Sequence, residues 1–384
     1  MANAKKMAYF DNAATTFPKP SVVYDFMDSF YRTSGGSFGR GNASVSAGEL
    51  VKDTRKKIRA LLHCSSKEVI FEPTATISLN IIIQGLIQKG SKIVYISPFE
   101  HNAVTRVLHH FESLGQIAVE VLPVALSESD FAEIEKRFEQ KKPALVILSH
   151  ASNVCGVVQE AEKIFSIAKK HGARTVLDMA QTAGLVDFNA GSNDVDFAIF
   201  AGHKTLYAPT GIAGFVMKRD FELPALLFGG TGFESANQDM PEDLPTRFEA
   251  GTMNILGVAG LNAALNWILE KGVNELFKSE CEKRKRLLEL FSRYPFIRVV
   301  GDYENKKYVG IVSVVIKNLP SDTASSVFAE QNIAVRSGLQ CAPLAHKTLG
   351  TFPAGTIRFS TSYFSSEEDF SELARALDWI GDNL

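Results

Sequence analysis

Short apolar runs that alternate with helical patterns constrain the fold of this 384-residue chain more than any other feature. Candidate strands occupy residues 68–72, 92–97, 118–123, 144–149, 174–178, 197–201 and 212–217. Stretches with helical periodicity lie between most of them, at 76–89, 103–114 and 161–171. This alternation predicts an α/β fold in which helices cover a mainly parallel sheet. Such a sheet binds ligands at the carboxyl ends of its strands.

The pattern changes after about residue 255. Two long helical patterns, 255–271 and 273–293, lead into a region with candidate strands at 311–317, 334–336 and 356–361. In the final helix Ser365 and Glu368 have capping-box spacing. Its apolar stripe is formed by Phe370, Leu373, Leu377 and Ile380. We therefore predict a large domain over residues 16–255 and a smaller α+β domain built from 1–15 and 256–384, with the N-terminal arm packed on the latter.

Composition and charge exclude several classes of protein. The formal net charge is -2 without an acidic or basic block, which gives no sign of a nucleic-acid partner. The first ten residues lack the apolar region of a signal peptide, and no apolar run approaches the roughly 20 residues of a membrane span. The four cysteines are widely spaced and include no CxxC pair, so they predict neither a disulfide framework nor a metal site. We expect a cytoplasmic protein in which one cysteine can be a working thiol.

Three polar residues follow candidate strands. Lys204 comes after the strand 197–201, where a lysine can form a Schiff base with an aldehyde cofactor, although most lysines are solvated surface charges. Asp178 ends the strand 174–178 and can pair with a protonated pyridine nitrogen, or alternatively cap a helix. Gln181, one turn further, can reach a ring oxygen.

Residues 74–76 offer a place for a phosphate, because they lie between the strand 68–72 and the helix 76–89. Helix capping alone explains their hydroxyl groups equally well. His101 follows the strand 92–97 and can lie over a flat ring, although a lone histidine is more often structural.

Two further residues lie late in the chain. Cys341 is in a loop marked by Gly338 and Pro343 and close to cations, so its thiol is more exposed and more easily ionised than that of a core cysteine. Arg358 stands on the polar face of the strand 356–361. Its planar fork suits a substrate carboxylate, with an ordinary salt bridge as the alternative.

The order and spacing of these signals resemble the cysteine desulfurase and selenocysteine lyase family, in the class-V aminotransferase group of fold-type I pyridoxal-phosphate (PLP) enzymes. The resemblance runs nearly end to end. Its segments read YFDNAATT at 9–16, EH at 100–101, SHASN at 149–153, DMAQ at 178–181, GHK at 202–204, RFEAGT at 247–252, RSGLQC at 336–341 and IRFS at 357–360. The RSGxxC form resembles the group II branch.

This resemblance implies a role for each matching residue. Lys204 is expected to hold PLP and, together with His101 and Cys341, to form the catalytic set, with Cys341 as the persulfide-forming nucleophile. Asp178 is expected at the pyridine nitrogen, Gln181 at the ring hydroxyl and His101 on the ring face. The remaining cofactor contacts implied are Ala75, Thr76, His203, Asn153 and, reaching in from the partner subunit of a homodimer, Thr252. The substrate-binding residues implied are Arg358, Asn153 and Asn12.

Three positions depart from the family pattern. Ala201 stands where many relatives have a serine, Gln340 stands where histidine is common before the cysteine, and residues 42–44 read NAS where relatives often have a histidine. These departures leave the lysine, the aspartate and the cysteine in place.

We therefore predict a PLP-dependent cysteine desulfurase that converts L-cysteine to L-alanine and passes sulfur through Cys341 to an acceptor, which we expect to be a protein. Selenocysteine lysis, transamination or epimerisation on the same scaffold are alternatives, although an ordinary aminotransferase has no need of Cys341. A sulfur-transfer scaffold with a vestigial site is an alternative from another class. A nucleotide-binding protein is disfavoured, because no GxGxxG follows the first strand and no P-loop is present.

Overall fold

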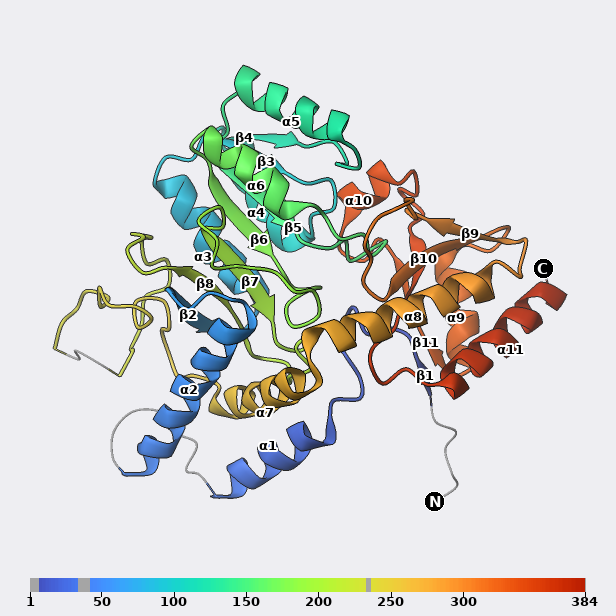
Figure 1. Cartoon of the computed structure of the whole chain (residues 1–384), viewed down its shortest axis with the longest axis horizontal. Coiled ribbons are helices and arrows are strands. Elements are labelled where there is room, and N and C mark those ends of the chain that lie inside the picture. The colour runs from blue at the N-terminus through green and yellow to red at the C-terminus, as the bar shows by residue number, and fades with distance from the viewer. Residues whose placement is uncertain (1–6, 34–41, 233–235, 384) are drawn as a thin grey trace.

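The computed structural model describes residues 7–33, 42–232 and 236–383 (Figure 1). A seven-stranded sheet with the order β2-β8-β7-β6-β5-β3-β4 forms the centre of one part. Its strands are β2 (Lys67–Glu72), β3 (Ile93–Ile96), β4 (Ala118–Val121), β5 (Leu145–Ser149), β6 (Arg174–Asp178), β7 (Phe197–Ala201) and β8 (Ala213–Lys218). Neighbouring strands are parallel except at β8, which runs antiparallel to β2 and β7. The predicted α/β fold with a mainly parallel sheet is confirmed.

The strands of this sheet are apolar on both faces because helices cover both. In β5, Leu145 and Ile147 join one core whereas Val146 and Leu148 join the other. The core of Leu145 and Ile147 is covered by α3 (Ala75–Gln88) and α4 (Asn102–Ser113). The opposite core is covered by α2 (Asn42–Leu61), α5 (Glu128–Gln140), α6 (Ala161–Lys170) and α7 (Ile255–Lys271), with α1 (Ser21–Thr33) against α7 (Figure 1). The central strands β5 and β7 therefore contain mainly apolar residues, and Ser149 and Asp178 stand at the carboxyl ends of β5 and β6.

A second, antiparallel sheet occupies the C-terminal part, with the order β12-β13-β10-β9. Its strands are β9 (Ile297–Val300), β10 (Ile311–Ile316), β12 (Arg336–Gly338) and β13 (Thr356–Ser360). Its core includes side chains from α8 (Val273–Phe291), α9 (Ser321–Glu330) and α11 (Glu367–Asn383), and the short α10 (Pro343–Thr348) lies between β12 and β13 in the chain. The N-terminal β1 (Ala8–Tyr9) pairs in parallel with β11 (Ile333–Ala334), so the start of the chain lies against its C-terminal part.

The structure corrects two local predictions. The expected strand 334–336 is divided, because β11 pairs with β1 whereas β12 pairs with β13. The capping box of α11 is formed one residue later than predicted, by Ser366 and Asp369: Ser366 N donates to Asp369 Oδ2 at 2.7 Å, and Asp369 N donates to Ser366 Oγ at 3.4 Å. The Ser365 hydroxyl is used in the preceding turn, where it accepts from Ser362 N at 3.0 Å. The predicted apolar stripe of this helix is buried.

The two packing units meet near the junction of α7 and α8. Val258, Leu261 and Leu265 of α7 belong to the core of the large sheet, so α7 packs with the first unit although it follows residue 255. The division into domains at 16–255 and at 1–15 with 256–384 stays a prediction, and its residues 1–6 lie outside the described part of the chain. Within the described ranges, none of the helices combines the length and the apolar character needed to cross a membrane.

Candidate active site

A cavity of about 340 Å³ lies where the carboxyl ends of β5, β6 and β7 face the second sheet. Both units contribute to its wall. The predicted site residues that line it are Ala75, Thr76, His101, Asn153, Asp178, Gln181, His203, Lys204, Cys341 and Arg358. Residues separated by more than 250 positions in the sequence thus meet in one cavity.

Lys204 and Asp178 lie at the same edge of the sheet because β6 and β7 pair in parallel. Asp178 is 7% exposed, and its Oδ1 accepts from Ala180 N at 2.9 Å. Burial raises the pKa of Asp178, while this hydrogen bond and the charge of Lys204 act in the opposite direction. Burial lowers the pKa of Lys204, which Asp178 partly counteracts. The site therefore contains an amine that gives up its proton more readily than a surface lysine does.

The start of α3 forms another part of the wall. Thr74 caps this helix, because its Oγ1 accepts from Ile77 N at 3.2 Å. Ala75 and Thr76 follow, and the first N–H groups of a helix have no acceptor within the helix itself. Both residues line the cavity. Capping and ligand binding are compatible here, since the helix start carries the partial positive charge that suits a phosphate.

Two neutral imidazoles border the cavity. His101 caps α4, and its Nδ1 accepts from Ala103 N at 3.0 Å, which leaves the proton of the neutral ring on Nε2. Burial, assisted by the charge of Lys204, lowers the pKa of His101 to about 4. The same two causes lower the pKa of His203 to about 4. Both rings are therefore uncharged near neutral pH and can lie against a flat ligand without adding charge.

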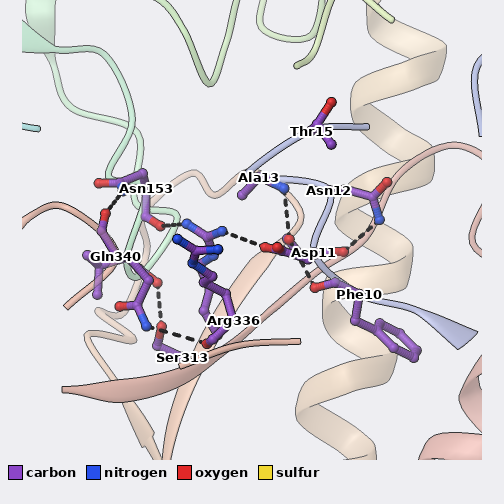
Figure 2. Close-up of polar contacts among 12 residues, drawn as sticks. Phe10, Asp11, Asn12, Ala13, Thr15, Asn153, Ser313, Arg336 and Gln340 are labelled. Atoms are coloured by element: carbon purple, nitrogen blue, oxygen red, sulfur yellow. Dashed lines mark hydrogen bonds and ion pairs between the residues drawn. The ribbon is translucent and has the colours of Figure 1, made fainter. Parts of the chain in front are cut away.

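Arg358 connects three segments of the site. Its side chain is buried in β13, where Nη1 donates to Asn153 O at 2.9 Å and Nη2 donates to Asp11 Oδ1 at 2.8 Å. Figure 2 labels Asp11, Asn153 and Gln340 and marks polar contacts in this part of the site. Among the residues that the structure describes, neither Arg358 Nε nor Asn153 Oδ1 has a hydrogen-bond partner, although both atoms are buried. A buried donor and a buried acceptor without partners, in the wall of one cavity, indicate a place for a polar ligand.

Cys341 follows β12 in an unusual backbone conformation. Gln340 has φ 42° and Cys341 has φ 55°, the left-handed region that costs a residue other than glycine about 1–2 kcal/mol. The carbonyls of this loop are held from the first unit: Gln340 O accepts from Asn153 Nδ2 at 2.7 Å, and Cys341 O accepts from Asn102 N at 2.7 Å. Cys341 is exposed, unlike the buried Cys64 and Cys155 and the half-buried Cys281. Its thiol is thus the accessible one, on the wall of the cavity.

Two predicted residues lie elsewhere. Asn12 is buried outside the cavity, where Nδ2 donates to Ser360 O at 2.8 Å and Oδ1 accepts from Phe17 N at 3.2 Å. In this structure Asn12 fixes the N-terminal segment to β13, and its role in substrate binding stays a prediction. Thr252 is exposed and does not line the cavity of its own chain.

Three contributors to the site were missed at the sequence level. Arg336 lines the cavity from β12, Asp11 pairs with Arg358, and the side chain of Gln340 is buried beneath the loop of Cys341. All three lie within the segments 9–16 and 336–341, which resemble the family. The resemblance marked these segments as part of the site but did not indicate the contacts of these residues. Of the departures, Ala201 lines the cavity, and the side chains of residues 42–44 lie outside the described part.

Comparison with known proteins places this site in a family. The family model for the class-V aminotransferases matches residues 8–373. The chain belongs to the class-V aminotransferase family. The resemblance proposed from the motifs is thereby confirmed.

Relatives of this class-V protein carry a more specific name. A probable cysteine desulfurase of Methanothermobacter thermautotrophicus is 31% identical, over 97% of this chain and 94% of the relative. Another from Pyrococcus abyssi is 32% identical, over 99% of this chain and 96% of the relative. The solved apo structure of the cysteine desulfurase from Thermococcus onnurineus matches with a TM-score of 0.88 at 29% identity, covering 98% of this chain and 95% of that one.

Proposed function

We propose that this class-V family member is a PLP-dependent cysteine desulfurase, which converts L-cysteine to L-alanine and passes sulfur through Cys341 to an acceptor. The observation that carries the proposal is the exposed Cys341 thiol in the cavity that also contains Lys204 and Asp178. An amine and a carboxylate at adjacent strand ends serve many PLP reactions. A thiol in the same cavity suits a reaction that takes sulfur from the substrate. The names of the relatives support the same activity and do not favour selenocysteine lysis.

The cavity residues fit PLP. Lys204 would bind the aldehyde of PLP, and Asp178 would face the ring nitrogen of PLP. The start of α3 at Ala75 and Thr76 would bind the phosphate of PLP. Gln181 and His203 also line the cavity, and the neutral His101 ring is available to cover the flat face of the cofactor. When bound, PLP draws electrons away from the α-carbon of an amino-acid substrate. Burial raises the pKa of Asp178, and a positively charged partner such as a protonated ring nitrogen would favour its ionised form.

The substrate carboxylate has a matching site at Arg358. Nε of Arg358 is buried without a partner among the described residues, and the guanidinium is already oriented by Asn153 O and Asp11. A carboxylate that binds this fork gains charge-assisted hydrogen bonds in a dry environment. Asn153 Oδ1, also without a partner there, is an acceptor for a substrate N–H.

Lys204 and Cys341 divide the bond changes between them. The Lys204 amine, whose pKa is lowered by burial, accepts the α-proton of the substrate and can return a proton to carbon. The Cys341 thiolate attacks the substrate sulfur: an S–S bond forms, the Cβ–S bond breaks, and its electron pair stays with the carbon fragment that becomes alanine. The persulfide on Cys341 then transfers its outer sulfur to an acceptor thiolate, which regenerates the Cys341 thiolate.

The test is alanine release from L-cysteine by the PLP-loaded protein in the presence of a thiol reductant. We expect Cys341→Ala to keep the cofactor and its colour change with L-cysteine but to lose alanine release by on the order of 100-fold or more. Cys281→Ala is the matched control, because the half-buried Cys281 lies outside the cavity, and it should keep wild-type release. Undiminished alanine release by Cys341→Ala would reject the proposal. Release from L-selenocysteine but not from L-cysteine would replace it with the lyase activity.

Two parts of the proposal concern partners. We include a homodimer in which Thr252 of the partner subunit reaches the cavity, since the exposed Thr252 cannot do so within one chain. We also include a protein as the sulfur acceptor, and a cytoplasmic location stays a prediction. Sedimentation of the PLP-loaded protein checks the first part: a monomer that retains full activity would contradict it.

A further inference from the structure

The side chain of Gln340 lies beneath the loop that carries Cys341, and all its hydrogen-bonding groups have partners. Gln340 is 6% exposed, and its Nε2 donates to Thr356 O at 2.9 Å and to Arg336 O at 3.4 Å. Its Oε1 accepts from Thr356 Oγ1 at 3.3 Å and lies 2.8 Å from His346 Nε2. The two carbonyl acceptors fix the orientation of the amide, so Oε1 is the atom that faces His346.

The amide orientation also fixes the histidine beneath it. His346 is fully buried in α10, and burial lowers its pKa to about 4, so the ring is neutral. Because Gln340 Oε1 can only accept, Nε2 of His346 carries the proton and donates. Nδ1 is then an acceptor, and it receives the hydroxyl of Thr351 at 2.7 Å. Gln340, His346 and Thr351 form one directed chain of hydrogen bonds, which we call the loop anchor.

The loop anchor acts on a backbone that needs support. The left-handed conformations of Gln340 and Cys341 are unfavourable on their own and persist only where surrounding contacts determine them. From the first unit, Asn153 Nδ2 and Asn102 N hold the two carbonyls of the loop at 2.7 Å. From the second unit, the loop anchor holds the side chain of the residue next to the thiol. None of its three members is proposed to hold PLP or substrate.

We propose that Gln340 and His346 are positioning residues that aim the Cys341 thiol at the substrate sulfur. The inference rests on the proposed function and assigns different steps of the reaction to different residues. The residues that hold PLP and substrate act before sulfur transfer, and the loop anchor acts only at that step. Removing it should therefore slow attack by Cys341 and leave earlier steps unchanged.

The decisive variants separate shape from hydrogen bonding. Gln340→Met keeps the length of the side chain but removes the acceptor of the His346 N–H and the donor to Thr356 O. His346→Leu removes the other end, whereas His346→Gln keeps an N–H near the position of Nε2. Gln331→Met is the matched control, because Gln331 is an exposed glutamine in the same unit and lies outside the loop anchor.

We expect Gln340→Met and His346→Leu to lower alanine release at saturating L-cysteine by about tenfold to 100-fold, the loss that a misplaced reacting group produces. KM and the rate of the colour change on adding L-cysteine should stay at wild-type values. His346→Gln should restore most of the release, and Gln331→Met should match wild type. Equal losses of the colour change and of alanine release, or wild-type release in both variants, would overturn the proposal.

A second readout keeps the inference separate from the activity. Hydrogen exchange of residues 338–345 should accelerate by about fivefold in Gln340→Met, with no change in the strands of the large sheet. Unchanged exchange in this segment would show that the loop anchor does not hold the loop. If wild type itself released no alanine, the proposed function would fail, and the exchange experiment would still decide whether Gln340 fixes the Cys341 backbone.

Discussion

Two sides of the cavity are held in place by different kinds of interaction. We call the side with Asp178 and Lys204 the sheet wall and the side with Cys341 the loop wall. On the sheet wall, Asp178 ends β6 and Lys204 lies in the turn after β7. Both strands are buried and paired on both sides, and burial shifts the pKa values of Asp178 and Lys204. On the loop wall, Cys341 lies in a left-handed turn held by individual hydrogen bonds. Secondary structure therefore determines where the first set lies, whereas side chains determine where the thiol lies. Substitutions on the sheet wall should therefore change the reaction rate without changing the structure. Substitutions on the loop wall should change the conformation of the loop.

The largest effect is expected from Lys204→Ala on the sheet wall. Alanine release should fall by on the order of 10⁴-fold, because the variant loses both the amine that attaches PLP and the group that moves the α-proton. Absorbance of the purified protein should show no attached cofactor. Release within tenfold of wild type would remove Lys204 from the site, while thermal unfolding serves as the control for an intact fold.

Asp178→Asn should have the next largest effect and should leave the shape of the site intact. An amide cannot supply the negative charge that a protonated ring nitrogen needs, so we expect kcat to fall by about 100-fold. Hydrogen exchange of the loop wall should match wild type, which separates this variant from those of the loop anchor. A wild-type kcat would contradict the assignment of Asp178.

Two glycines test the loop wall by stability instead of activity. A Cβ on Gly355 would lie 2.3 Å from Gly338 O, next to the pairing of β12 with β13, whereas a Cβ on Gly350 would meet nothing within 4 Å. Both residues have positive φ, 75° and 68°. We expect Gly355→Ala to lower the free energy of unfolding by about 3 kcal/mol and Gly350→Ala by about 1 kcal/mol. If urea unfolding showed equal decreases in the free energy of unfolding for both variants, the contact of the new Cβ with Gly338 O would have no energetic cost.

Arg358→Lys tests the residue that joins the walls. Lysine keeps the charge but cannot hold Asn153 O, Asp11 and a carboxylate in one plane, so KM for L-cysteine should rise by about 30-fold. The effect on kcat should be smaller. A variant with wild-type KM and reduced kcat would instead place Arg358 in the reaction step.

The smallest effect concerns pH. The pKa of His346 is lowered by burial from 6.5 to about 4, so below pH 6.5 the unfolded chain binds a proton that the folded chain accepts only near pH 4. The free energy of unfolding is therefore unaffected by protonation of His346 above pH 6.5. As the pH falls from 6.5 toward 4, it decreases by about 1 kcal/mol per pH unit. His346→Gln should therefore unfold with a shallower dependence on pH between 6.5 and 4.5. An unchanged slope would mean that His346 is not neutral in the fold.

The sheet wall could be predicted from the sequence more completely than the loop wall. Strands buried on both faces leave long apolar runs, and the bounds of β6, β7 and α7 match the predicted ones. The strand-end rule then located Asp178 and Lys204. No such rule predicts the contact of Asp11 with Arg358, which lies 347 residues later in the chain. The hydrogen bond from Asn12 to Ser360 O is likewise a long-range contact that the sequence does not indicate. The break between β11 and β12 likewise depends on pairing partners that are distant in sequence.

The contact between Asp11 and Arg358 also sets an order in biosynthesis. Asp11 is synthesised 347 residues before its partner Arg358. A nascent chain of 271 residues already contains β6, β7 and α7, with Asp178 and Lys204, but it lacks Cys341 and Arg358. Because domains fold as units during synthesis, the amine can be in place long before a sulfur-accepting group exists nearby. Under the proposed function, sulfur transfer therefore cannot begin before Cys341 has been synthesised.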